Sequence, residues 1–285
     1  MKSTLHITSG DTSGGNLAKA GIPGDVFVWH DILYDGPRNP GWPDDETLSA
    51  RAQFLERETG GGLSQAHVLD VLRDQYHILS RAQDYERIVL WFDACLFDQS
   101  MLVHILTCLR HYVQTAELIC IDAFPGIIPY NGIGQLSPEQ LASVYGQRTH
   151  VTDEQFTFAE TADRAFAVQD VAGFHTIATM KDAPIAWVPA AVRRWLLEFP
   201  DAYTGLGQLE RLALEAIRSG HNKPVAIFKA VAAEDTPPQY WGDTTLWAKI
   251  NGLADKQLVR IDGPAGRLPQ WGASDKIKGY MIIPL

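Results

Sequence analysis

The chain has 285 residues, of which 46% are hydrophobic, so it is long enough for one large globular domain or two ordinary ones. It has no run of about 18 apolar residues, so no membrane contact is expected. The formal net charge of −10 comes from residues 1–185, where acidic residues are twice as numerous as basic ones. Because an acidic surface repels phosphate, a nucleic-acid partner is not expected, except at the C-terminal part.

The start of the chain and its cysteines indicate a cytoplasmic protein. MKSTLHITSGD lacks the apolar core of a signal peptide. The cysteines lie in apolar stretches without the spacing of a metal site, which is typical of buried thiols in a reducing compartment; they are Cys95, Cys108 and Cys120.

Four strands are predicted in the first half of the chain, and each runs into an aspartate. The strands are Leu5–Ser9, Val26–His30, Ile88–Phe92 and Leu118–Ile121, and the aspartates are Asp11, Asp31, Asp93 and Asp122. The last two strands are almost wholly apolar and flank one helix, which indicates parallel pairing through a right-handed crossover. If all four are parallel, their carboxyl ends share one rim, where open α/β sheets bind ligands.

The connections between these strands are predicted to be helical. A short helix follows the segment SGDTSGGN, and two helices of an insertion of about 55 residues separate the second and third strands. The second of these has Ser64 as its N-cap, and the insertion is long enough to form a lid over the rim. Asp98 is predicted to cap the helix after the third strand.

Helices dominate the sequence after the fourth strand. Ser137 with Gln140 and Thr152 with Gln155 have the pattern of capping boxes. Prolines near residue 185 predict a boundary between a domain of residues 1–185 and one of residues 186–285. The second domain is predicted to be winged-helix-like, from helices at Leu206–Ser219, Val225–Ala232 and Asp243–Lys256 and strands at Leu258–Ile261 and Tyr280–Ile283. The fold class is therefore α/β, with an open, mainly parallel Rossmann-like sheet, a helical insertion, a helical segment and this C-terminal domain.

The candidate catalytic residues lie at the strand ends: Asp11, His30, Asp31 and Asp93. Asp11 and Asp93 are the candidate ligands of a cation such as Mg²⁺. His30 or Asp31 is the candidate base, and because neighbouring strand residues point to opposite faces, only one of the two is expected to face the site.

The remaining candidates would bind the ligand. SGDTSGGN is open to two interpretations, a phosphate-binding turn formed with Ser9, Gly10 and Thr12 or a tight turn with an Asx cap at Asp11 or Asn16. It is not a Walker loop, because no GK[ST] follows. Polar groups for the same site are Arg38, Gln99, Asp122 and Gln135. Cys95 is either a nucleophile activated at a helix N-terminus or a core residue.

The C-terminal domain offers two kinds of partner. Its basic residues near the predicted recognition helix and wing are few for DNA binding: Lys249, Lys256, Arg260 and Arg267. Its tryptophans are candidate anchors of a protein interface: Trp241, Trp247 and Trp271.

Several of these motifs carry a resemblance. LHITSGDTSGGNL, VWHDILYDGP, LWFDACLFDQ and the stretch from IDAFPG to GIGQL resemble an uncharacterised bacterial family catalogued as a domain of unknown function. The segment from GLGQLERLALEAI through YWGDTTLWAKINGLADKQLV resembles the companion C-terminal domain. The resemblance implies that Ser9–Asp11, Trp29–Asp31, Asp98–Gln99 and Gly134–Gln135 belong to the motif-bearing portion. It implies no reaction, and the acid–His pair of the family is replaced here by Asp93-Ala94-Cys95.

Two functions of different classes remain open. The first is a hydrolase or transferase that binds a small phosphorylated or nucleotide-like ligand at the acidic strand ends, with a divalent ion to offset the carboxylates. The second is a non-enzymatic regulatory protein that binds a protein partner through the C-terminal domain.

Overall fold

A computed structural model describes residues 2–112, 115–235, 241–270 and 276–285. The chain forms two compact units, and both are discontinuous in sequence. The first unit contains Met1–Arg51 and Leu69–Arg194, and the second contains Ala52–Val68 and Trp195–Leu285. Part of the predicted helical insertion therefore belongs to the same unit as the C-terminal residues. Among the described residues, no helix combines the length and the apolar character needed to cross a membrane.

The first unit contains a five-stranded sheet with the order β2-β1-β3-β4-β5. Its strands are β1 (Lys2–Ser9), β2 (Asp25–Trp29), β3 (Tyr85–Asp93), β4 (Glu117–Ile121) and β5 (Thr149–His150). The first four are parallel and β5 is antiparallel to β4. The prediction of an open, mainly parallel Rossmann-like sheet is confirmed, and β5 adds an edge strand that the sequence did not indicate.

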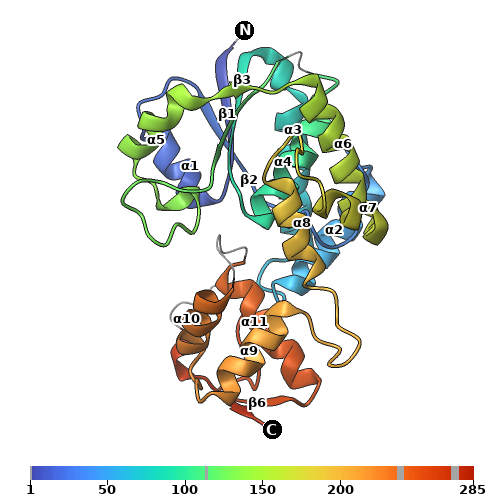
Figure 1. The fold of residues 1–285 in the computed structure, drawn as a ribbon, viewed down its shortest axis with the longest axis vertical. Helices are drawn as coiled ribbons and strands as arrows, with labels where there is room; N and C mark the ends of the chain where they lie inside the picture. Colours follow the sequence, from blue (N-terminus) through green and yellow to red (C-terminus); the bar gives the residue numbers. More distant parts are fainter. Residues whose placement is uncertain (1, 113–114, 236–240, 271–275) are drawn as a thin grey trace. The chain divides into compact units, whose positions relative to one another are not determined.

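Helices cover both faces of this sheet (Figure 1). One face carries α1 (Asp11–Ala18) and α5 (Pro138–Val144), and the other carries α3 (Gln65–Ser80), α4 (Leu96–Leu109) and α6 (Asp153–Val168). Val89 and Trp91 of β3 lie in the apolar core under α1 and α5. The alternate residues of β3 are equally buried toward the other face, among them Leu90 and Phe92. The continuous apolar run of β3 follows from this double cover.

The remaining helices of the first half and middle of the chain are short or connect the others. They are α2 (Asp45–Glu58), η1 (Ala82–Asp84), η2 (Ile133–Gln135), η3 (Tyr145–Gln147), α7 (Val171–Ala178) and α8 (Val188–Leu196). The Tyr76 ring of α3 meets the Trp29 ring edge-on at 5.1 Å, and the side chain of Gln75 accepts a hydrogen bond from the backbone N–H of His30. The helix α3 is therefore a crossover helix on the sheet, where the sequence suggested a lid.

The ends of the helices follow local chemistry, with two corrections. Both predicted capping boxes form, at Ser137 and at Thr152. The N-cap of α4 is Cys95, whose sulfur accepts from the N–H of Asp98, so Asp98 is not the cap. The helix α1 begins at Asp11, so the glycine-rich segment is helical and not a turn, and Gly14 lies where a β-carbon would approach Val28 Cγ2 to 2.2 Å.

In the described residues after Gly207, the second unit contains three α-helices and a two-stranded antiparallel sheet. They are α9 (Gln208–Arg218), α10 (Pro224–Glu234), α11 (Asp243–Asp255), β6 (Val259–Asp262) and β7 (Met281–Pro284), with the short helix η4 (Ile277–Gly279) before β7. Trp241 and Trp247 are buried and their rings contact Phe228. They form the core of this unit and do not anchor an exposed interface as expected, while Trp271 lies outside the described residues.

Candidate functional site

The carboxyl ends of β2 and β1 are joined by an exposed histidine–carboxylate pair. His30 follows β2 and Asp11 is the first residue of α1, directly after β1 and Gly10. His30 Nε2 lies 2.8 Å from Asp11 Oδ1, and the two side chains are 47% and 89% exposed. The backbone N–H of His30 is held by Gln75 of α3. The pair therefore combines a positioned imidazole with access to solvent.

Asp31 faces away from this pair. Its carboxylate forms a buried ion pair with Arg51 of α2, with 2.8 Å between Nη2 and Oδ1, and it also accepts from the N–H of Ile32. The Arg51 guanidinium donates further to the backbone carbonyl of Asp35. Asp31 therefore stabilises the connection after β2, and His30 is the candidate base of the two.

A second group of acids lies buried where β1 and β3 end. The Asp98 carboxylate accepts from the Ser9 hydroxyl and from the backbone N–H of Asp93, at 2.5 and 2.7 Å. The Asp93 carboxylate accepts from the backbone N–H groups of Cys95 and Ile133, at 2.9 and 3.2 Å. Ser9 ends β1, Asp93 ends β3, and Cys95 and Asp98 lie at the start of α4, while Ile133 contributes its backbone N–H from η2. The pairing of β1 with β3 therefore brings the group together.

The two carboxyl groups lack a cationic partner. No Lys, Arg or His in the described part of the chain forms an ion pair with Asp93 or Asp98, although both are at least 95% buried. Burial raises the pKa of Asp98 well above its ordinary value, and the negative charge of Asp93 raises it further. Burial also raises the pKa of Asp93, against the lowering effect of its hydrogen bonds with Cys95 and Ile133. The arrangement therefore requires a proton or another positive charge at this point.

Cys95 does not have the environment of a nucleophile. Burial raises the pKa of its thiol well above the ordinary value, and the negative charges of Asp93 and Asp98 raise it further. The N-cap position at α4 does not overcome these effects, so the thiol form is favoured at neutral pH. Gln99 is fully buried beside the same group, and its Nε2 donates to the carbonyl oxygen of Asp93.

The candidate metal ligands group differently from the prediction. Among the described residues, the one set of at least three potential ligands consists of Asp93, Cys95 and Asp98, with one ligand atom from each lying within 4.8 Å of the others. Asp11 does not belong to this set, because its carboxylate is turned to His30. The sequence placed Asp98 near the strand ends, where it could complete a polar site, but helix capping was the preferred interpretation. Its signal was an acid in the first turn of a helix that starts directly after a strand.

Two further predicted ligand-binding residues do not join this group. Asp122 is exposed after β4 and accepts from Trp187 Nε1 at 3.3 Å. The side chain of Gln135 accepts from the N–H of Asn131 and donates to the carbonyl oxygen of Pro129, so it closes its own loop.

The N-terminus of α1 has no side-chain cap. Gly10 occupies the N-cap position with a φ of 71°, a left-handed conformation that glycine adopts without strain. Thr12 in the first turn is exposed, and Ser9 is turned to Asp98. The first backbone N–H groups of α1 are therefore not satisfied by a side chain, which is the property that lets a helix N-terminus bind an anion.

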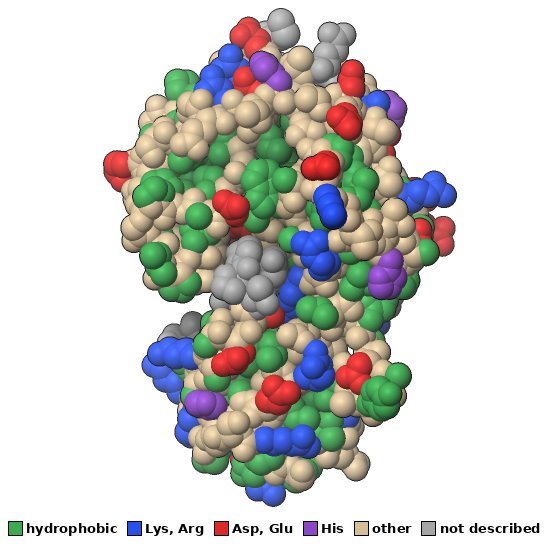
Figure 2. Space-filling view, in the orientation of Figure 1, with side chains coloured by type: hydrophobic (Ala, Val, Ile, Leu, Met, Phe, Trp, Pro, Cys, Tyr) green, Lys and Arg blue, Asp and Glu red, His purple; other side chains and the backbone are tan. Residues whose placement is uncertain are grey.

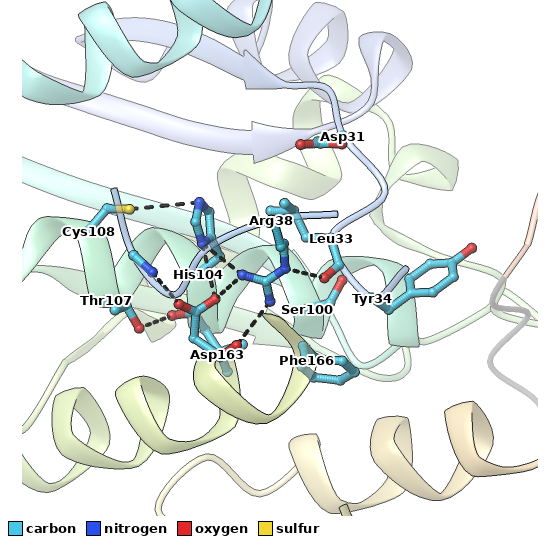
Figure 3. A network of polar contacts seen from close by, with 12 residues as sticks. Asp31, Leu33, Tyr34, Arg38, Ser100, His104, Thr107, Cys108, Asp163 and Phe166 are labelled. Atoms are coloured by element: carbon cyan, nitrogen blue, oxygen red, sulfur yellow. Dashed lines mark hydrogen bonds and ion pairs between the residues drawn. The ribbon is translucent and has the colours of Figure 1, made fainter. Parts of the chain in front are cut away.

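Arg38 lies in a buried polar network (Figure 3). Its Nη1 donates to Asp163 Oδ1 of α6 at 2.6 Å, and its Nε donates to the carbonyl oxygen of Leu33. The side chains of Arg38 and Asp163 are 3% and 0% exposed. His104 of α4 lies between Asp163, 3.0 Å away, and Tyr76 of α3, 2.6 Å away. Arg38 was expected to meet an anionic ligand at the rim, but its guanidinium is occupied within this network.

The four basic residues that the sequence placed near a recognition helix and wing are each paired with an acid. Lys256 contacts Glu210 at 2.7 Å, and the other pairs are Lys249 with Glu198, Arg260 with Asp262, and Arg267 with Asp255. On the face visible in Figure 2, Lys and Arg side chains of this unit are interspersed with Asp and Glu. The mutual neutralisation weakens the positive potential that phosphate binding requires.

Comparisons with known proteins do not add a function to this geometry. No protein-family model matches the chain, and no curated protein matches it.

Proposed function

We propose that the rim formed by the ends of β2, β1 and β3 binds a small phosphorylated or nucleotide-like ligand together with a divalent cation, and that the protein is a hydrolase or transferase. The observation that carries the proposal is the exposed His30–Asp11 pair at the uncapped N-terminus of α1, with His30 Nε2 and Asp11 Oδ1 2.8 Å apart. A base and an anion-binding helix end lie together.

The phosphate of the ligand would be bound by the first N–H groups of α1. The helix dipole favours a negative charge at this end, and Gly10 lets the ligand approach the backbone closely. The Asp11 carboxylate opposes an anion at the same end, so a divalent cation is needed to offset the acids of the rim.

His30 would act as the general base. If Nε2 carries the proton that is donated to Asp11, Nδ1 is free to accept a proton from water or from a substrate hydroxyl. Asp11 then orients the ring and stabilises the imidazolium that forms, as a positioning residue. The reaction would be attack of the activated oxygen on phosphorus, with the leaving oxygen departing on the opposite side.

Calorimetric titration with Mg²⁺ and a panel of nucleoside mono-, di- and triphosphates tests the proposal. Phosphate release is measured in parallel for the wild type and for His30→Gln. His150→Gln is the matched control, because His150 is an exposed histidine of β5 in the same unit. Turnover that is lost in His30→Gln and retained in His150→Gln supports the proposal. Absence of both binding and turnover with every phosphorylated compound refutes it.

The remaining parts of the hypothesis concern the second unit and the setting of the protein. We propose that the second unit is winged-helix-like, because three helices precede its antiparallel strand pair. A protein partner is less favoured than the sequence suggested, since Trp241 and Trp247 are buried, and paired basic residues disfavour nucleic acid. The cytoplasmic location and the resemblance to the uncharacterised family stay predictions.

A further inference from the structure

The acids at the ends of β1 and β3 form a centre of uncompensated negative charge. Asp93 and Asp98 are 5% and 2% exposed, and no cationic side chain in the described ranges pairs with either. Two other buried acids of the same unit each have an arginine partner. Asp31 has Arg51 and Asp163 has Arg38, each as a direct ion pair. A buried acid without such a partner is costly, so a positive group that does not belong to a side chain is expected here.

Two unsatisfied polar atoms lie around the same centre. Gln99 Oε1 and the Tyr130 hydroxyl are buried and have no hydrogen-bond partner among the described residues. The amide of Gln99 lies against Asp93, because its Nε2 donates to the Asp93 carbonyl oxygen at 2.6 Å. Tyr130 lies in the same packed cluster as Ile133, whose N–H donates to Asp93. Unsatisfied buried oxygens are rare in folded proteins and indicate a missing partner.

We propose that Asp93 and Asp98 form a binding site for one hard divalent cation, Mg²⁺ or Mn²⁺, beside Ser9 at the ends of β1 and β3. The role of this cation rests on the proposed function, since a phosphorylated ligand at the N-terminus of α1 needs a cation nearby. It assigns the cation to Asp93 and Asp98, in place of the pair Asp11 and Asp93.

The chemistry of the site selects this class of ion. Two carboxylates offset the charge of one divalent cation, and the remaining atoms on offer are oxygens, which Mg²⁺ and Mn²⁺ prefer. Two oxygens on opposite sides of a Mg²⁺ ion lie about 4.2 Å apart. The ligand atoms of Asp93 and Asp98 are within 4.8 Å of each other, so small side-chain rotations bring both to one ion. Cys95, the third member of this set, offers a soft sulfur atom that a hard cation does not prefer, so it is not counted as a ligand.

Ser9 would hold Asp98 in place as a positioning residue. Its hydroxyl donates to Asp98 Oδ1, while Asp98 Oδ2 accepts from the N–H of Asp93. Each carboxylate oxygen keeps a second lone pair for the ion. The strand end of β1 therefore contributes orientation, and β3 with the start of α4 contributes the ligands.

Titration of the full chain with Mn²⁺, followed by the electron paramagnetic resonance signal of the free ion, tests the site without any phosphorylated ligand. One Mn²⁺ per chain is expected, displaced by excess Mg²⁺. Asp98→Asn keeps the shape and one acceptor oxygen, which can take the Asp93 N–H while the NH₂ group faces the Ser9 hydroxyl oxygen. It removes a charge and is expected to weaken binding by at least about tenfold. Asp122→Asn is the matched control, because Asp122 is an exposed acid at the neighbouring strand end, and its affinity should equal that of the wild type.

Circular dichroism and melting curves establish that each variant is folded. If Asp98→Asn does not fold, Ser9→Ala is measured in its place, with an expected weakening of roughly tenfold through loss of orientation. A wild type that binds no Mn²⁺, or a folded Asp98→Asn that binds it unchanged, overturns the site and leaves a shared proton as the positive group. A different result would refute the proposed function alone. In that case Mn²⁺ would bind to the wild type, but nucleotides would neither bind nor be turned over, and His30→Gln would behave like the wild type.

Discussion

Replacing Asp163 by Asn is expected to destabilise the first unit strongly. The Asp163 carboxylate is fully buried and accepts from Arg38 Nη1, from the N–H of Gly41 and from His104, at 2.6, 2.7 and 3.0 Å. An Asn amide has one acceptor oxygen, so whichever way it faces, its NH₂ group meets a buried N–H donor. The guanidinium of Arg38 also loses its only carboxylate among the described residues.

The expected decrease in the free energy of unfolding follows from the loss of the ion pair between Arg38 and Asp163. Removing one partner of a buried ion pair costs about 3–5 kcal/mol, because the other charge stays buried without compensation. The total stability of a domain is about 5–15 kcal/mol. The exposed pair Arg81–Asp84 gives the matched control in the same unit, since its side chains are 61% and 43% exposed. Asp84→Asn is expected to cost less than about 1 kcal/mol.

Urea unfolding followed by circular dichroism measures the change in the free energy of unfolding, and hydrogen exchange of the α4 and α6 amides assigns it to the first unit. The double variant Arg38→Met with Asp163→Leu removes both charges and is expected to be more stable than Asp163→Asn. The reasoning is refuted if Asp163→Asn costs no more than Asp84→Asn, or if the double variant is the less stable of the two.

Three further predictions address packing and charge. Gly14→Ala places a β-carbon 2.2 Å from Val28 Cγ2 and is expected to destabilise the first unit by about 1–3 kcal/mol. Gly15→Ala is the control, because nothing lies within 4 Å of its β-carbon, and in the same urea assay it should be neutral or stabilising by about 0.5–1 kcal/mol. Burial raises the pKa of Asp98 in the folded protein, so the folded state loses stability as the pH rises above the pKa of this group in the unfolded chain. At pH 8 in EDTA, Asp98→Asn should therefore raise Tm by about 2–4 °C. An unchanged or lower Tm contradicts this prediction. Burial alone would raise the pKa of Asp163, but the charges of His104 and Arg38 and its hydrogen bonds bring it below the usual range. Wild-type stability should therefore fall as pH drops below about 4, and a stability curve flat from pH 5 to 2 would disprove it.

The sheet could be predicted from the sequence because its signals are local. Apolar runs, turn residues and capping patterns lie within a few positions of one another, as at Ser137 and Thr152. The strand-end aspartates could be located from the apolar runs that precede them. Their ion-pair and hydrogen-bond partners could not. Arg51 pairs with Asp31 across 20 positions, and Ser9 bonds to Asp98 across 89. Such contacts depend on strand order and helix orientation, which residue patterns do not encode.

The same limit explains the misassigned residues of the second unit. Tryptophans are frequent in interfaces and in cores, and only the packing of Trp241 and Trp247 against Phe228 decides between them. Asp98 is a comparable case, since an acid in a first helical turn fits capping. Its actual contacts with Ser9 and Asp93 arise from the junction of β3 with α4.

The interleaving of the two units has a consequence for how the chain folds during synthesis. Ala52–Val68 belong to the second unit, and Gln270 Nε2 donates to the carbonyl oxygen of Glu58, 212 positions earlier. These early residues leave the ribosome long before Trp195–Leu285 are synthesised, so the second unit cannot fold completely until those later residues have emerged. A fragment that begins at Trp195 lacks part of its own unit. Cleavage of the chain near that residue is therefore expected to leave two fragments that stay associated.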